Sequence, residues 1–135
     1  MRIVGTELEE RLEKILVEKV LTIGNSFSLQ MLPENFNPEK LHIVEVDKEE
    51  FRNWILWYEH YGMQVESALG HDSTVNLYNQ VMDARMWTNR KNVSLEGEVL
   101  FVFQISGRRP EEGKIYTEEE LKEFDIRYFI VWLED

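Results

Sequence analysis

The stretch Val99-Leu100-Phe101-Val102-Phe103-Gln104-Ile105 decides the fold of this chain. Its run of apolar, β-branched and aromatic residues is typical of a buried β-strand. The turn signal Glu96-Gly97-Glu98 precedes it, so Val93 to Leu95 is the expected partner strand of a hairpin. A second apolar run, Ile126 to Leu133, predicts another strand near the C-terminus.

The segments on either side of this core predict further strands and several helices. Two more strands are expected at Val20 to Ile23 and at Leu41 to Val46. Helices are expected where capping residues precede apolar residues at helical spacing. Four such helices should begin at Thr6, at Asp47, at either Asp72 or Ser73, and at Thr117. Another helical stretch should follow Gly62 and run up to Leu69. Ser28 to Leu32 should form one helical turn. The prediction is an α+β fold in which helices flank a small mixed sheet of about four to five strands.

Length and composition indicate one domain over residues 1–135, with residues 1–18 as an extra N-terminal amphipathic helix. The net charge of −11 argues against binding to long nucleic acids, which requires many Lys and Arg contacts to phosphate. An anionic ligand should therefore be small and bound by a few local donors. No apolar run approaches membrane-spanning length.

The absence of cysteine excludes disulfides and thiolate metal sites, and it fits a reducing cytoplasm. His42 and His60 have no second histidine at helical ligand spacing, so no metal site and no cofactor are predicted.

The pentapeptide Gly70-His71-Asp72-Ser73-Thr74 is the strongest candidate for chemistry, because it stands just before an apolar helical run. The first amides of a helix lack partners within the helix, and the helix dipole favours an anion there. Imidazole groups exchange protons near neutral pH, so His71 could move a proton on a bound phosphodiester. The alternative is a capped helix with a surface histidine.

Two other segments are candidates for anion binding. In the turn from Gln104 to Lys114, either Arg108 or Arg109 could bind a phosphate, with Glu112 holding that arginine in place. The segment Gly24 to Leu32 offers amides and hydroxyls after a strand. Ordinary solvated loops are the alternative at both places.

Together, these three segments resemble the viral type III anti-CRISPR ring nucleases, a family once grouped as a domain of unknown function in archaeal viruses. The resemblance covers roughly residues 18–135. It rests on Ile23-Gly24-Asn25-Ser26-Phe27-Ser28-Leu29-Gln30-Met31-Leu32, on Leu69-Gly70-His71-Asp72-Ser73-Thr74, and on Phe103-Gln104-Ile105-Ser106-Gly107-Arg108 with Glu112-Gly113-Lys114.

This resemblance implies a metal-independent homodimer in the host cytoplasm that encloses one cyclic tetra-adenylate and cleaves it. His71 would protonate the leaving 5′ oxygen, the ligand's own 2′-hydroxyl would attack, and Arg108 or Arg109, supported by Glu112, would stabilise the scissile phosphate. The loop holds one residue more than the family pattern, which leaves Arg108 against Arg109, and Glu111 against Glu112, open. The implied ligand-binding residues are Asn25, Ser28, Gln30, Ser73, Thr74 and Gln104.

Two other readings stay open. The chain could sequester cyclic oligoadenylate without cleaving it, or it could be a small regulatory module that binds a protein through its N-terminal helix and its aromatic segment. Four- and six-membered adenylate rings also remain alternatives.

Overall fold

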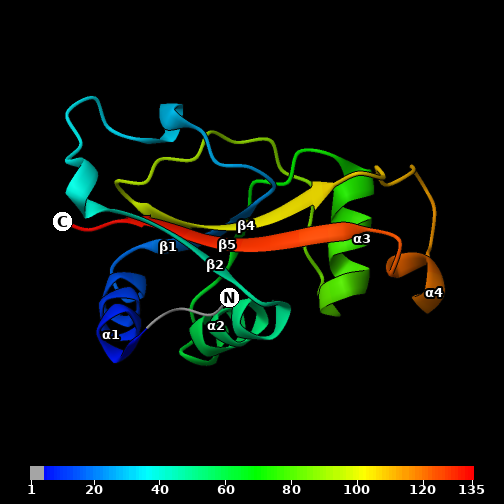
Figure 1. The fold of residues 1–135 in the computed structure, drawn as a ribbon, viewed down its shortest axis with the longest axis horizontal. Helices are drawn as coiled ribbons and strands as arrows, with labels where there is room; N and C mark the ends of the chain where they lie inside the picture. Colours follow the sequence, from blue (N-terminus) through cyan, green and yellow to red (C-terminus); the bar gives the residue numbers. More distant parts are fainter. Residues whose placement is uncertain (1–4) are drawn as a thin grey trace.

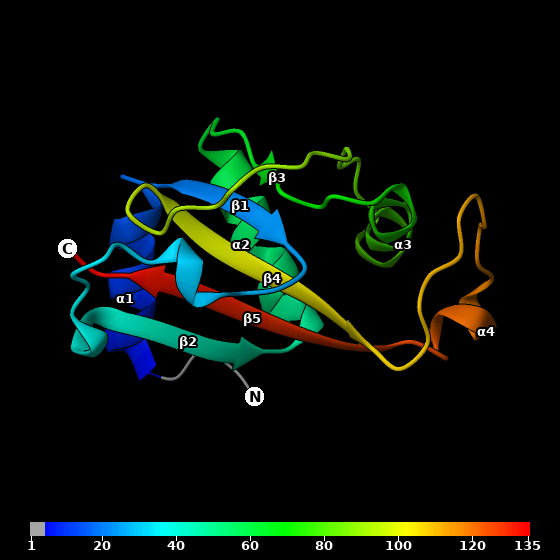
Figure 2. The same cartoon turned by 90° about the horizontal axis from the view of Figure 1, so that it is seen from above.

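One mixed five-stranded sheet organises the chain, in the order β2-β5-β4-β1-β3 (Figure 2). The computed structural model describes residues 5–135, and the side chains of residues 7–135. β4 pairs antiparallel with β5 and parallel with β1, while β2 is antiparallel to β5 and β3 is parallel to β1. The strands are β1 (Val20–Gly24), β2 (Leu41–Val46), β3 (Glu66–Ser67), β4 (Glu98–Ser106) and β5 (Asp125–Leu133). The predicted α+β fold is confirmed, with β4 at the centre of the sheet.

The helices and the loops cover different faces of this sheet. α1 and α2 lie on one face, whereas long loops cross the other, and α3 stands at one end (Figure 1). The described helices are α1 (Gly5–Leu16), α2 (Lys48–His60), α3 (Asp72–Met82) and α4 (Glu118–Leu121), with 3-10 turns at η1 (Leu29–Met31) and η2 (Pro38–Lys40). η1 confirms the single turn that was predicted before Pro33.

The two faces bury two unequal cores. The larger core lies under α1, α2 and α3, and it holds most of the fully buried aromatic side chains. The smaller core lies on the opposite face, where loop side chains pack on β4 and β5. The loop residues that cover it are Phe27, Met31, Leu32, Phe36, Val93 and Leu95.

The N-terminal amphipathic helix is confirmed, and it packs into the larger core. Leu12 and Leu16 are fully buried in the same cluster as Trp132 of β5. α1 lies within residues 1–18, which the sequence predicts as an N-terminal helical extension, and it shares the hydrophobic core of the domain. Residues 1–4 and the side chain of Thr6, including its predicted capping box, lie outside the described part of the chain.

The predicted hairpin between Val93–Leu95 and β4 is wrong. Residues 93–95 form no strand, and the Leu95 N–H donates to the Met31 carbonyl at 2.9 Å instead. Val93 and Leu95 bury their side chains in the smaller core, so this segment covers a face of the sheet. β1 and β5 already occupy both edges of β4.

The helix predicted between Gly62 and Leu69 is also wrong. Val65, Ser67 and Leu69 are buried while the residues between them are not, which is the period of an extended chain. The Ala68 N–H donates to the Ile23 carbonyl at 2.7 Å, next to the short strand β3. Tertiary pairing along β1 therefore overrides the local pattern.

Two predicted helix caps are confirmed. The Asp47 carboxylate accepts from the Glu50 N–H at 2.8 Å and begins α2. Thr117 and Glu120 form the reciprocal capping box of α4, with bonds of 3.2 and 3.1 Å. Both caps satisfy amides that a helix start leaves without partners.

Lys19 is a buried lysine that fastens three segments together. Its side chain is 4% exposed, and Nζ donates to the carbonyls of Leu95 and Leu133 at 2.9 and 2.8 Å. The exposed Asp135 carboxylate lies 3.6 Å from Nζ. Lys19 thus joins the entry to β1, the turn before β4 and the end of β5.

Candidate functional site

His71 occupies the N-cap position of α3, which the sequence pattern assigned to Asp72 or Ser73. It has an extended backbone, its carbonyl accepts the Val75 N–H at 3.1 Å, and its side chain makes no capping bond. The Asp72 carboxylate instead accepts a hydrogen bond from the Thr88 hydroxyl. An exposed imidazole therefore stands beside helix amides that no side chain of residues 7–135 caps.

This imidazole lines an open, mostly polar pocket of about 520 Å³. Three segments meet there: the end of β1, the loop that leads into α3, and residues 88–94, which we call the strap. The lining residues are Asn25, Ala68, Gly70, His71, Arg90, Lys91 and Asn92. The pocket thus combines a proton carrier, two cations and two amides, which is a suitable lining for a phosphate.

Hydrogen bonds hold the strap along the loop before α3. The Asn89 side chain donates to the Ser67 carbonyl, and its N–H donates to the Leu69 carbonyl, both at 2.8 Å. Arg90 Nε donates to the Gly70 carbonyl at 3.0 Å. A Cβ at Gly70 would lie only 3.3 Å from Arg90 Cγ, so glycine permits this close approach.

Glu98 anchors the other end of the strap. Its carboxylate accepts from Lys91 Nζ at 2.6 Å, from the Ser94 N–H at 2.8 Å and from the Thr22 hydroxyl at 2.7 Å. Desolvation acts to raise the pKa of Glu98, but these hydrogen bonds outweigh it and lower that pKa. Because Glu98 compensates the charge of Lys91, Arg90 supplies the less compensated cation of the pocket.

Arg90, Lys91 and Asn92 line the pocket but are absent from the site residues predicted from the sequence. The available signal was the polar, basic run Asn89-Arg90-Lys91-Asn92 in a strongly acidic chain. This run is far from Asn25 along the chain, so its position near the end of β1 could not be predicted from the sequence. That position depends on the path of the strap.

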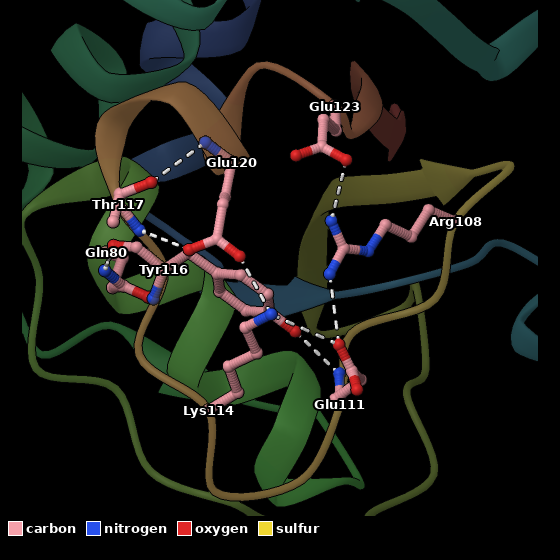
Figure 3. Close-up of polar contacts among 8 residues, drawn as sticks. All are labelled: Gln80, Arg108, Glu111, Lys114, Tyr116, Thr117, Glu120 and Glu123. Atoms are coloured by element: carbon pink, nitrogen blue, oxygen red, sulfur yellow. Dashed lines mark hydrogen bonds and ion pairs between the residues drawn. The ribbon is translucent and has the colours of Figure 1, made fainter.

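A second cluster forms around Arg108 at the end of β4 (Figure 3). Its guanidinium binds Glu123 at 3.1 Å and Glu111 at 3.0 Å, and it lies over the rings of Tyr116 and Phe124 at 5.4 and 5.1 Å. The hydrogen bond that Arg108 donates to the Glu111 carboxylate is the main cause that raises the pKa of Arg108. Two carboxylates and two rings fix this side chain.

These contacts distinguish between the alternatives that the sequence leaves open for the arginine and its partner in this loop. Glu111 and Glu123 bind Arg108, whereas Glu112 and Arg109 are exposed and form no ion pair within residues 7–135. The curvature of the turn explains the difference, because it brings the carboxylate at i+3 back onto Arg108.

The other predicted ligand residues divide between surface and core. Thr74 is only 6% exposed, so its side chain packs inside the domain, and its contact with ligand stays a prediction. The residues that keep exposed or partly exposed side chains are Asn25, Ser28, Gln30, Ser73 and Gln104. Of these, Asn25 shares the pocket with His71.

The pocket and the Arg108 cluster are separate groups within one protomer. None of the described residues of the cluster lines the pocket. The start of α3 and the end of β4 nevertheless lie toward the same end of the molecule (Figures 1 and 2). Gln80 of α3 also exchanges two hydrogen bonds of 2.8 Å with the backbone of Tyr116.

Glu120 should titrate far below an ordinary glutamate. Hydrogen bonds from Lys114 Nζ, at 2.8 Å, and from the Thr117 N–H lower its pKa from 4.5 to about 2. The pKa of Glu120 is lower in the folded protein than in the unfolded one. The stability that the interactions of ionised Glu120 contribute is therefore complete above about pH 4.5 and is lost as the pH falls towards 2. Carboxyl NMR titration should show that Lys114→Met raises the Glu120 midpoint towards 4.5.

Lys122→Met is the matched control, because Lys122 pairs with Glu119 at 3.4 Å. An equal rise in both variants would contradict the assigned ion pair.

Among the described residues, no group of three or more His, Cys, Asp or Glu side chains is arranged to hold a metal ion. None of the described helices combines the length and apolar character of a membrane span.

The chain is similar to proteins of archaeal viruses. B116 of Sulfolobus turreted icosahedral virus is 32% identical, with a TM-score of 0.70 over 84% of this chain and 98% of that protein. The uncharacterized protein ORF116 of Acidianus filamentous virus 1 is 36% identical over 59 residues, a match that spans half of its length. The family model described as STIV B116-like matches residues 21–130. The family model covers most of this chain, and the fold matches that of B116. This chain therefore belongs to the STIV B116-like family.

Proposed function

We propose that this protein is a metal-independent ring nuclease that opens cyclic tetra-adenylate and so silences type III CRISPR second-messenger signalling. The observation that carries the proposal is the exposed imidazole of His71 at the uncapped start of α3, in one pocket with Arg90 and Asn25. A helix start and a guanidinium attract a phosphate, and the imidazole supplies a proton at that place.

The reaction is an internal transesterification. The ligand's 2′-oxygen attacks the adjacent phosphorus, the bond from phosphorus to the 5′-oxygen breaks, and protonated His71 gives its proton to that leaving oxygen. The proton of the 2′-hydroxyl passes to solvent, which also reprotonates His71, so no water is consumed. Two such cuts convert one ring into two linear di-adenylates, each with a 2′,3′-cyclic phosphate.

The charge distribution of the chain supports a small cyclic anion as the ligand. The net charge of −11 opposes long polyanions, while Arg90 and the first amides of α3 offer a local positive site. A homodimer would present two copies of His71 to a ligand with its own repeated symmetry. Arg108 would join the site if a phosphate oxygen replaced one of its two carboxylate partners.

The direct test is incubation of the purified protein with cyclic tetra-adenylate in EDTA, with the products resolved by chromatography and mass. Di-adenylate with a cyclic phosphate is the expected product. Intact ligand that stays bound to the protein would replace the proposal with a sequestering function. Neither cleavage nor binding, also with cyclic hexa-adenylate, would overturn it in favour of a protein-interaction module.

Arg90→Ala should weaken binding of cyclic tetra-adenylate roughly ten- to hundredfold, because a charge-assisted bond to phosphate is lost. Isothermal titration calorimetry on wild type and variant checks this expectation. Arg11→Ala is the control, since Arg11 is a partly exposed arginine that pairs with Glu7 on α1 and does not line the pocket. Equal affinity of Arg90→Ala and wild type would remove Arg90 from the site.

A further inference from the structure

A second pocket, of about 420 Å³, lies between α2 and the C-terminal end of α3. Residues 83–87, which follow α3, form one of its walls. No residue of this pocket lines the His71 pocket. Its volume falls in the range of small-molecule sites in proteins, roughly 300–1,000 Å³.

Tyr78 lines this pocket and carries a hydroxyl without a hydrogen-bond partner among the described side chains. Its side chain lines the pocket and is only 1% exposed, and its hydroxyl has no hydrogen-bond partner within residues 7–135. In that part of the chain, the fully enclosed polar side-chain atom without a partner is Trp132 Nε1. Because the Tyr78 hydroxyl has no partner and is not among these fully enclosed atoms, it is not completely enclosed. The pocket that Tyr78 lines gives the hydroxyl this access.

The hydroxyl is held as a hydrogen-bond donor. Burial first, and the nearby charge of Glu59 second, raise the pKa of Tyr78 well above its ordinary value. Phe103 packs against the ring in an edge-to-face contact, with centroids 5.0 Å apart. Tyr78 thus offers an O–H from a rigid position to an acceptor atom in the pocket.

The rest of the lining favours a ring without net charge. The cations Arg52 and Arg85 are balanced by the anions Glu59 and Asp83. Arg52 is also held by a 3.1 Å hydrogen bond from Nε to the Met82 carbonyl. With the lining charges cancelled, the pocket does not select strongly for either an anion or a cation.

Apolar and aromatic side chains supply the surface on which such a ring would pack. Trp87 is 40% exposed at the pocket, and its indole can stack on a planar molecule. Met82 and Met86 also line the pocket, and thioether side chains adapt to flat apolar shapes. The carboxylate of Glu59 is an acceptor for a ring N–H on the same molecule.

From this lining we propose that the pocket binds a small, neutral heteroaromatic molecule that carries both a hydrogen-bond donor and an acceptor. The acceptor takes the Tyr78 O–H, the donor bonds to Glu59, and the ring packs against Trp87. The site is independent of the proposed nuclease activity, because it uses other residues and another kind of ligand.

7-Azaindole is a suitable probe, since it is neutral and places an N–H next to a ring nitrogen. In an NMR titration of the full chain, it should shift the backbone amides of residues 83–87 in a saturable manner. Benzoate and benzylamine, its charged counterparts, should bind at least several-fold more weakly. Absence of a saturable shift, or tighter binding of either charged probe, would overturn the proposal.

Tyr78→Phe removes only the hydroxyl, so the ring packing and the fold should persist. The affinity for 7-azaindole should fall about fivefold, as expected for one lost hydrogen bond. Tyr128→Phe is the matched control, because Tyr128 is also buried and lines neither pocket. Glu59→Gln should weaken binding as well, and unchanged affinity in both Tyr78→Phe and Glu59→Gln would contradict the assigned contacts.

Discussion

Replacing His71 with alanine should slow single-turnover cleavage of cyclic tetra-adenylate by about two orders of magnitude or more, while the ligand still binds. A positioned general acid accelerates proton transfer by roughly 10²–10⁴-fold, and its loss lowers the rate of the chemical step. The His71 side chain is exposed and makes no capping bond, so the variant should fold like the wild type. Rapid-quench cleavage and calorimetric binding, measured side by side, separate the two effects.

His60→Ala is the matched control for this experiment. His60 is an exposed histidine in the last turn of α2 and does not line the His71 pocket. Its replacement should leave the rate within twofold of wild type. Near-wild-type cleavage by His71→Ala would remove the assigned acid, and a parallel loss of binding would turn His71 into a binding residue.

Replacing Lys19 with methionine should lower the free energy of unfolding by roughly 3 kcal/mol, because each buried polar group left without a partner costs about 1–3 kcal/mol. The substitution leaves the Leu95 and Leu133 carbonyls without their donor. Methionine keeps a similar length and fills the same space, so the loss reports the ammonium group rather than a cavity. Urea unfolding followed by tryptophan fluorescence measures it.

Lys14→Met serves as the control, since Lys14 is an exposed lysine on α1. It should change the stability by less than about 0.5 kcal/mol, as most surface substitutions do. A loss below about 1 kcal/mol in Lys19→Met would mean that water replaces the ammonium at both carbonyls.

The parts of the fold that could be predicted are those whose signal is local. β4 and β5 are long apolar runs, and α2 combines an Asp47 cap with apolar residues at helical spacing. The two wrong elements have weak local signals and strong distant partners. Within residues 62–69, Glu66 and Ser67 pair with β1, and residues 93–95 cover the smaller core, so contacts far along the chain decide the conformation of both segments.

The candidate site divides in the same way. His71 could be found because one pentapeptide places it at a helix start. Arg90 could not, since its position beside Asn25 depends on the strap that Asn89 and Glu98 hold in place. The choice of Glu111 over Glu112 depended on the curvature of one turn, which spacing alone leaves undetermined.

By itself, the sequence determined the α+β class, the central strands, the caps of α2 and α4, and a histidine at the start of α3. These features depend on neighbouring residues, whose periodicity and hydrogen-bonding groups act over a few positions. Only the tertiary structure decided the two layers over the sheet, the buried Lys19, the lining of the His71 pocket and the opening at Tyr78. Each of these depends on side chains that are distant in the chain, and their proximity follows from burying apolar surface on both faces of one sheet.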